Sequence, residues 1–474
     1  MRATTASAHP TLSQPTPDAR RLDNVTRSGV LAAVAALLAV SGGLLWFVGY
    51  NYDGLTGNPI TKIHPFTYMI VALAAWRSLT FGNPVGYGVL VVSRRPATAL
   101  MLLVASSMLV VTAARAGPGI AGYADTFIGP ALLVFLLVEI DERDVTRLTV
   151  LLHVVMTANA LLGLYEFATN TLVFPYRLDG VTFINDTRSS ALQGHPLVNA
   201  SLTAIYVMAL LGGAKSLPNG VKLGLIGLQC AALVVFGGRS AMVTVGVLGG
   251  LYIGWLAFAA LRRDRISLLG AAVALAILSI VPALIFTVIS AGLVDKILMR
   301  FVSDGGSAIA RVAMFDLFPY FSLRELIVGP DVAYVDSLRR INGLEWGIEN
   351  PIVRMILYQG AFVTMIVLGS FGLFLRELIQ NRERRVWLPI LATLILLNTS
   401  ESIAVKTTLV AKIVIIVVCL FRPTFQRATF RPSAATISGS NSRVRSSMIP
   451  MPSKRFQNAH GNRNVSAPQR TSSI

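Results

Sequence analysis

Three arginines and a Glu–Asn pair carry the strongest chemical signal in this chain. Arg188 lies in a polar segment, Arg239 follows two glycines, and Arg354 comes four residues after Asn350. Arginine binds phosphate groups through charge-assisted, often bidentate hydrogen bonds. A carboxylate beside them can act as a general base if its surroundings raise its pKa. We therefore predict that Arg188, Arg239, Asn350 and Arg354 bind an anionic, lipid-linked substrate and that Glu349 is the catalytic group.

Two further residues are candidates for binding the same substrate, and each candidate also has a structural alternative. His195 stands just before Pro196 at the start of an apolar run, where it could simply mark the interface. Arg311 lies in a short amphipathic stretch and could contact phosphate or lipid headgroups. Arg239 could be an interfacial anchor, and Glu349 could cap a following helix, since negative charge is favourable at a helix N-terminus.

The composition predicts a membrane protein. The chain has 474 residues, of which 54% are hydrophobic and 14% charged, whereas soluble domains carry about 25% charged residues. The net charge of +18 fits Lys and Arg retained near anionic headgroups, so nucleic acid is not an expected partner. Both cysteines, Cys230 and Cys419, fall in apolar runs and form no disulfide framework or metal-ligand spacing.

Apolar runs of about 20 residues predict membrane-spanning helices rather than barrel strands. We find twelve: 28–50, 64–82, 98–115, 120–140, 148–168, 195–213, 221–236, 240–261, 266–292, 350–375, 386–401 and 403–421. The expected fold is thus all-α, a polytopic integral membrane protein with about twelve transmembrane helices. Arg77, within the second run, is expected to snorkel to the interface.

The charge pattern orients these runs. Basic residues occupy the short loops at 94–95, 143–147, 215–222, 262–265 and 376–385, while the turns near 116–123 and 400–402 carry none before Lys406. By the positive-inside rule, both termini are cytoplasmic. The expected plan is a polar cytoplasmic segment 1–27, spans one to nine over 28–292 with a periplasmic loop 169–194, a large periplasmic loop 293–349, and three spans over 350–421.

The tail 422–474 has nine Lys or Arg residues and no Asp or Glu. It cannot bury enough apolar surface to fold, so we expect a disordered, basic cytoplasmic tail that contacts anionic lipid.

Four segments give the chain a resemblance to a known family. They are Gly237-Gly238-Arg239-Ser240-Ala241, the stretch Arg311–Phe318 with its later Val328-Gly329-Pro330, the run Asn350 to Gly360, and Ser400-Glu401. In their order and sidedness they resemble the bacterial O-antigen ligase and polymerase superfamily, which includes exopolysaccharide polymerases. The similarity covers roughly residues 180–405.

The resemblance implies an enzyme of the bacterial inner membrane. It would transfer a glycan from an undecaprenyl-pyrophosphate carrier to a sugar hydroxyl at the periplasmic face, without a metal or other cofactor. The implied partners are the carrier-linked oligosaccharide, membrane lipids, and a chain-length regulator and flippase of the same pathway. The family's ligases have a His where this chain has Glu349, which favours a polymerase over a ligase. A flippase or transporter of lipid-linked glycans is the alternative from another class.

Overall fold

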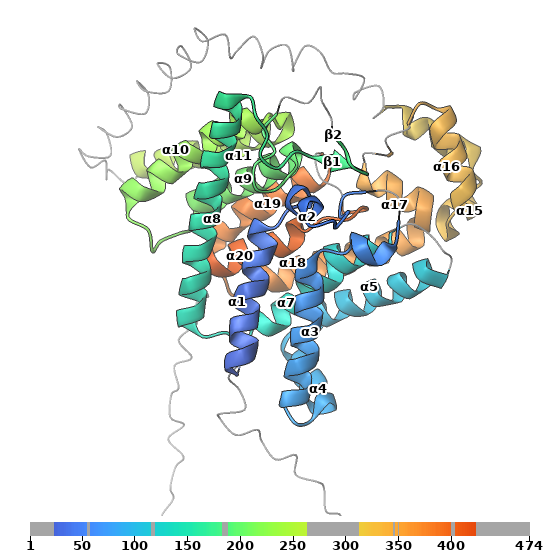
Figure 1. Ribbon diagram of the computed structural model, residues 1–474, viewed down its shortest axis with the longest axis horizontal. Coiled ribbons are helices and arrows are strands. Elements are labelled where there is room, and N and C mark those ends of the chain that lie inside the picture. The colour runs from blue at the N-terminus through green and yellow to red at the C-terminus, as the bar shows by residue number, and fades with distance from the viewer. Residues whose placement is uncertain are drawn as a thin grey trace, which may run out of the picture. The chain divides into compact units, whose positions relative to one another are not determined.

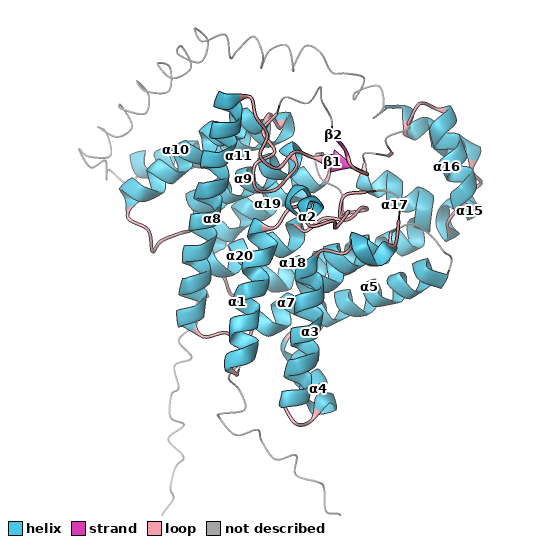
Figure 2. Cartoon of the chain, in the orientation of Figure 1, coloured by secondary structure: helices cyan, strands magenta, loops and turns pink. Residues whose placement is uncertain are grey.

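The computed structural model describes residues 23–54, 57–114, 119–182, 188–262, 312–344, 347–348, 350–399 and 403–422. Helices make up most of these ranges (Figure 2), and the one sheet they contain is a two-stranded antiparallel hairpin that pairs Arg177 with Thr182. The elements run α1 Asn24–Ala39, α2 Gly42–Phe47, η2 Pro59–Lys62, α3 Pro65–Thr80, α4 Pro84–Arg94, α5 Pro96–Ala114, α6 Ile120–Tyr123, the π-helix η3 Ala124–Ile128, α7 Gly129–Leu137, α8 Glu142–Thr169, β1 Arg177–Leu178, β2 Val181–Thr182, α9 Pro196–Gly212, α10 Asn219–Phe236, α11 Arg239–Leu261, η4 Phe315–Tyr320, α15 Leu323–Val328, α16 Val332–Ile341, α17 Pro351–Gln359, α18 Ala361–Ile379, η5 Arg384–Val386, α19 Trp387–Leu397 and α20 Leu409–Leu420.

Several of these helices are long and apolar enough to cross a membrane, as the composition predicts. Within the described ranges six qualify by length and hydropathy: Pro96–Ala114, Ile120–Leu137, Glu142–Thr169, Asn219–Phe236, Arg239–Ala260 and Ala361–Ile379. Shorter apolar helices occupy Asn24–Ala39, Pro196–Gly212 and Leu409–Leu420. The chain is therefore an all-α membrane protein, and the count of twelve spans stays a prediction. The expected ninth span, 266–292, and the tail beyond residue 422 lie outside the described residues.

Helices α9 and α20 form the centre of the bundle (Figure 1). α9 packs against α10, α11 and α19, and α20 packs against α8, α9 and α7. Nearly every side chain of both helices is buried, including Tyr206 of α9. Because these two helices are buried on nearly every face, the remaining helices surround them.

Two of the expected spans are not continuous helices. The run 28–50 is divided at Val40, because Ser41 starts α2 by accepting a hydrogen bond from the Leu44 N–H at 3.2 Å. The run 350–375 is divided at Gly360, where φ is +87° and α17 gives way to α18. Helix breaks free backbone groups that can face a ligand, and both breaks occur beside the cavity described below.

Contacts sort the loops into two groups. One group links segments that the charge pattern places on one side of the membrane. Its contacts are Arg27–Asp141, Arg95–Glu377 and Lys215–Glu383. The other joins loops expected on the opposite side, through Asn51–Asp179, Tyr52–Lys406 and Thr126–Val405. Segments to which the charge pattern gives the same side therefore touch one another, and the sidedness itself stays a prediction.

Arg77 does not snorkel, contrary to expectation. Its Nε donates to Glu139 Oε2 at 2.9 Å, and the two side chains are 5% and 2% exposed. The guanidinium also lies 5.7 Å from the Phe81 ring. An arginine that finds a buried carboxylate and an aromatic ring has no need to reach the interface.

The segment from Val312 to Ile341 forms a small cluster on α17. Within the amphipathic stretch that follows Arg311, residues Phe315–Tyr320 form the 3-10 helix η4, which contains Pro319. Leu317 is buried with Val335 and Leu357, whereas Val312 is 66% exposed. The apolar residues of this stretch are therefore shared between a core and a surface, because a 3-10 helix repeats every three residues and not every 3.6.

Candidate functional site

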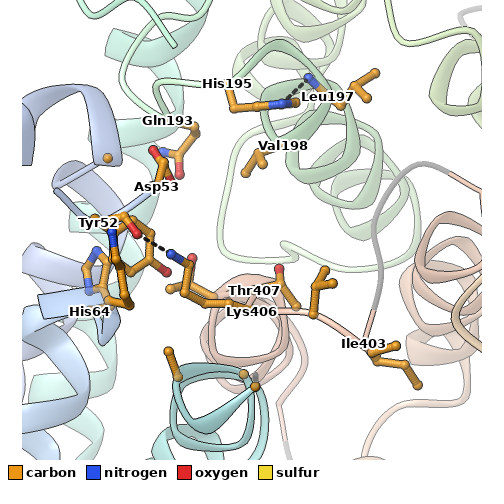
Figure 3. A pocket seen from close by; sticks show the side chains of 18 of the residues that line it. Tyr52, Asp53, His64, Gln193, His195, Leu197, Val198, Ile403, Lys406 and Thr407 are labelled. Atoms are coloured by element: carbon orange, nitrogen blue, oxygen red, sulfur yellow. Dashed lines mark hydrogen bonds between the residues drawn. The ribbon is translucent and has the colours of Figure 1, made fainter. Parts of the chain in front are cut away.

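A cavity of about 1110 Å³ lies among segments that are far apart in the sequence. Its walls come from 40–64, the start of α6, the loop before α9, the start of α11, α17, and the segment between α19 and α20. Figure 3 shows Asp53, His195 and Lys406 around part of this space. A cavity of this size matches the largest ligand pockets, which reach about 1,000 Å³.

The cavity is strongly basic. The described residues that line it include six cationic side chains and a single carboxylate, that of Asp53; the cations are Lys62, Arg188, Arg239, Arg354, Lys406 and Lys412. A concave surface lined by one sign of charge concentrates ligands of the opposite sign. The cavity is therefore built for an anion.

A buried carboxylate shapes the loop that carries Arg188 and His195. Glu166 of α8 is 1% exposed, and it accepts hydrogen bonds from the N–H groups of Val173, Ser190 and Ala191 at 2.8, 2.9 and 2.8 Å. Buried backbone donors need such partners. Glu166 thus ties Val173, Ser190 and Ala191, near the two ends of the segment between α8 and α9, to α8, although it does not itself line the cavity.

His195 sits at the N-terminus of α9 and has a defined tautomer. Its Nδ1 accepts from the Leu197 N–H at 3.1 Å, so a neutral ring carries its proton on Nε2. The Tyr176 ring packs edge-on against it, with 4.3 Å between ring centroids. Capping accounts for one nitrogen of His195, while the residue still lines the cavity.

Close helix packing places Arg239. It is the first residue of α11 and follows Gly238, where a Cβ would lie 2.4 Å from the Ala200 Cβ of α9. Only glycine allows this approach. The N-terminal ends of α9 and α11, both favourable for anions, therefore reach the cavity together with Arg239.

Arg354 is carried by α17 and is held over the Tyr358 ring, 5.4 Å from its centroid. The Tyr358 hydroxyl in turn donates to Asp336 Oδ1 at 2.6 Å. Asn350 caps the same helix, because its Oδ1 accepts from the N–H groups of Ile352 and Val353 at 2.9 and 3.1 Å. Arg354 lines the cavity and Asn350 does not.

Two of the segments on which the resemblance rests, Val328-Gly329-Pro330 and the run from Asn350 to Gly360, meet at α17. A Cβ on Gly360 would lie 2.5 Å from the Gly329 nitrogen and 2.5 Å from the Ile327 oxygen. The backbones around Gly329 and Gly360 are therefore in direct contact. This contact sets the position of α17, and therefore of Arg354, against α15 and α18.

The π-helix η3 fixes the opposite wall. Asp125 accepts from the Tyr52 hydroxyl at 3.1 Å and from the Thr67 hydroxyl at 2.7 Å. The next residue, Thr126, donates to the Val405 carbonyl at 3.1 Å. One helical turn thus ties together the segments that carry Lys62 and Lys406, and π-helical turns often occur at functional sites.

Asp53 is placed in a loop beyond α2, and burial raises the pKa of its carboxyl. The positive charges of Lys406, Lys62 and Lys412 oppose that rise. Asp53 and the three lysines are therefore close enough to influence one another.

Four of the predicted site residues line the cavity together: Arg188, His195, Arg239 and Arg354. Asn350 lies at the neighbouring helix cap. Glu349 and Arg311 lie outside the described residues. Within the described ranges, no group of three or more His, Cys, Asp or Glu side chains could hold a metal ion.

Sequence reasoning missed the contribution of 51–64. Lys62 and Asp53 line the cavity, and Lys62 falls in a loop that the charge pattern assigns to the outer side. The positive-inside rule does not require a basic residue in an outer loop. The presence of Lys62 in such a loop is therefore the sequence signal that could have identified it.

Comparison with known protein families, curated proteins and solved structures finds no match to this chain.

Proposed function

We propose that this protein is a polysaccharide polymerase of the bacterial inner membrane. It transfers a glycan from an undecaprenyl-pyrophosphate carrier to a sugar hydroxyl. The observation that carries the proposal is the basic cavity, in which Arg188, Arg239 and Arg354 come from three separate parts of the chain. A pyrophosphate leaving group gains negative charge as the anomeric bond breaks, and preorganised cations stabilise that charge.

The proposed orientation places both termini in the cytoplasm and the cavity at the periplasmic side. In support, every segment that lines the cavity is a loop or a helix end that the charge pattern assigns to the outside. The basic loops at 94–95, 215–222 and 376–385 contribute nothing to its lining. A carrier-linked substrate presented at the outer leaflet would thus meet the cavity.

In this mechanism the arginines bind the pyrophosphate and a base takes the proton of the acceptor hydroxyl. Glu349 is the proposed base, and its neighbour Ile348 lines the cavity. His195 is a second group able to orient the acceptor, since Nδ1 is engaged at the helix cap and Nε2 carries the proton of the neutral ring. General-base help is worth about 10²- to 10⁴-fold in rate.

Arg239→Ala tests the proposal in a deletion strain complemented with each variant. We expect the protein to remain in the membrane but long polymer to fall about 10²- to 10³-fold, the usual effect of removing one stabilising donor. Single repeat units should accumulate on the carrier at the periplasmic face. Arg262→Ala, at the exposed other end of α11, is the matched control and should leave chain length unchanged.

Other outcomes of the same extraction point to the alternatives. Full-length polymer that lacks only its final lipid attachment would indicate an O-antigen ligase. Units trapped on the cytoplasmic side would indicate a flippase, which the helix break at Val40–Ser41 beside the cavity favours, because transporters build sites from discontinuous helices. Normal polymer in Arg239→Ala would refute the role of that residue.

A further inference from the structure

The protein holds the Arg354 guanidinium at the cavity wall through two contacts. Its Cζ lies 5.4 Å from the centroid of the Tyr358 ring, which stands one turn further along α17. A Cβ on Gly347 would lie 3.3 Å from Arg354 Nη1, so the Gly347 backbone also approaches the guanidinium closely. Gly347 has a φ of +111°, a conformation that glycine adopts without strain. The position of the Arg354 charge therefore depends on the positions of Tyr358 and Gly347.

The Tyr358 ring is itself anchored by a carboxylate from another helix. Its hydroxyl donates to Asp336 Oδ1 at 2.6 Å, and Asp336 belongs to α16, which packs against α17. Hydrogen bonds to an ionised acceptor are shorter and roughly twice as strong as those between neutral groups. Asp336 thus fixes the ring on which Arg354 rests, although it does not itself line the cavity.

A second series of contacts leads from Asp336 to Gly347. Arg339 Nε lies 3.5 Å from Asp336 Oδ1, and Arg339 Nη1 donates to the Leu344 carbonyl. The Gly347 N–H donates to the same Leu344 carbonyl at 3.1 Å. Asp336 therefore stands at the start of both routes to the Arg354 guanidinium. The residues of the two routes, which we call the Arg354 clamp, are Asp336, Arg339, Leu344, Gly347 and Tyr358.

Such a clamp affects how tightly an arginine binds an anion. A long side chain that is mobile in the free protein loses conformational freedom when it contacts a ligand, and this loss weakens binding. A guanidinium that is already held loses little freedom, and its charge stands where the ligand needs it. Arg354 lines the cavity, whereas no residue of α16 does. Through the clamp, α16 can therefore influence a bound anion from outside the cavity.

We propose that Asp336 is a positioning residue for anion binding. Through the Tyr358 hydroxyl it holds the Tyr358 ring and, with it, the Arg354 guanidinium at the cavity. This inference rests on the proposed function and deepens it, because it assigns control of the affinity for pyrophosphate to a helix that does not line the cavity.

The sign of the effect separates positioning from simple electrostatics. Asp336 is a negative charge near the cavity, so removing that charge would by itself allow an anion to bind more tightly. Loss of the anchor has the opposite effect, because Tyr358 and Arg354 then gain freedom that binding must remove. Weaker binding after removal of the carboxylate therefore identifies a positioning role.

The test measures binding of geranyl pyrophosphate to the full-length protein in phosphatidylcholine nanodiscs. We expect Asp336→Ala to bind about tenfold more weakly than wild type, the effect of losing one hydrogen bond to a charged group. Tyr358→Phe keeps the ring but lacks the hydroxyl, so its affinity should fall by the same factor. Asp336→Asn keeps an acceptor oxygen and should bind within about threefold of wild type.

Asp331→Ala is the matched control on the same helix. Asp331 is exposed and caps α16, since its Oδ1 accepts from the Tyr334 N–H at 2.9 Å. Its replacement weakens the helix but leaves the clamp in place, so the affinity should not change. The double variant Asp336→Ala with Arg354→Ala should bind no more weakly than Arg354→Ala alone, because residues that act through one another are not additive.

Unchanged or tighter binding by Asp336→Ala would overturn the inference, as would a further loss in the double variant. An equal loss in Asp331→Ala would do the same, since α16 would then act only through its stability. So would a loss in Asp336→Asn as large as in Asp336→Ala. If Asp336→Ala does not fold, Tyr358→Phe makes the same test.

The probe also separates this inference from the proposed function. If wild type binds geranyl pyrophosphate through Arg354 and the affinity does not depend on Asp336, only the positioning role fails. If wild type does not bind geranyl pyrophosphate, the proposed function fails.

Discussion

The backbone contact between Gly329 and Gly360 makes Gly360→Ala a demanding test of the site's architecture. An alanine Cβ would lie 2.5 Å from the Gly329 nitrogen, whereas ordinary contact begins at 3.4 Å. Both partners are backbone atoms, so the two segments must separate by roughly 1 Å in a tightly packed protein. Alanine must also adopt the φ of +87° that Gly360 has.

Two costs add in this variant. A residue other than glycine held in such a backbone conformation costs about 1–3 kcal/mol, and overpacking costs about 1–3 kcal/mol more. We therefore expect Gly360→Ala to lower the free energy of unfolding by about 2–6 kcal/mol. Because α17 begins its contact with α18 here, Arg354 moves too, and a displacement of about 1 Å can reduce activity about 10²-fold.

The assay is thermal unfolding of the purified protein in nanodiscs, followed by intrinsic fluorescence, together with polymer length in complemented cells. Gly369→Ala is the matched control, because Gly369 lies in α18 and a Cβ there meets nothing within 4 Å. That control should be neutral or slightly stabilising, as alanine favours helix. If Gly360→Ala melted with the control and made normal polymer, the reasoning from the backbone contact would be wrong.

Two further predictions concern the carboxylates of Glu166 and Asp53. Glu166→Gln places an amide N–H against backbone donors, so stability should fall by about 1–3 kcal/mol and the loop 170–194 should be cut faster by protease; the exposed Glu142→Gln on the same helix is the control, and equal cleavage would contradict the role of Glu166. Burial raises the pKa of the Asp53 carboxyl in the folded protein. The protein therefore loses stability as the pH rises from the ordinary Asp pKa of about 3.9 to this raised value, because ionising the carboxyl costs more free energy in the folded state than in the unfolded state. Asp53→Asn should therefore be more stable than wild type near neutral pH and equal to it in acid; a less stable variant near neutral pH would show that attraction to the lysines outweighs burial.

Much of the helical plan follows from local pattern. Apolar runs correspond to helices wherever the structure describes them, because a span needs a continuous apolar stretch. The breaks at Val40 and Gly360 were not predicted, since the residues on both sides of each break are equally apolar. Arg77 also escaped prediction, because its partner Glu139 is distant in sequence and hydropathy carries no information on pairing.

The residues of the site likewise divide into those that local sequence indicates and those whose role only the packing reveals. Arg188, His195, Arg239 and Arg354 could be nominated from residue type and spacing, since a charged group at the edge of an apolar run needs a reason to be there. That they line one cavity could not be read from the chain. The role of Glu166 was likewise hidden, because it acts through backbone N–H groups that have no residue signature.

By itself the sequence determined the class of protein and the positions of most helices, because hydropathy and charge act locally along the chain. Tertiary structure alone decided which loop ends share a cavity, how Gly329 and Gly360 set the position of α17, and that three lysines gather around Asp53. These features depend on contacts between segments far apart in the sequence, which only the packing of the helices brings together.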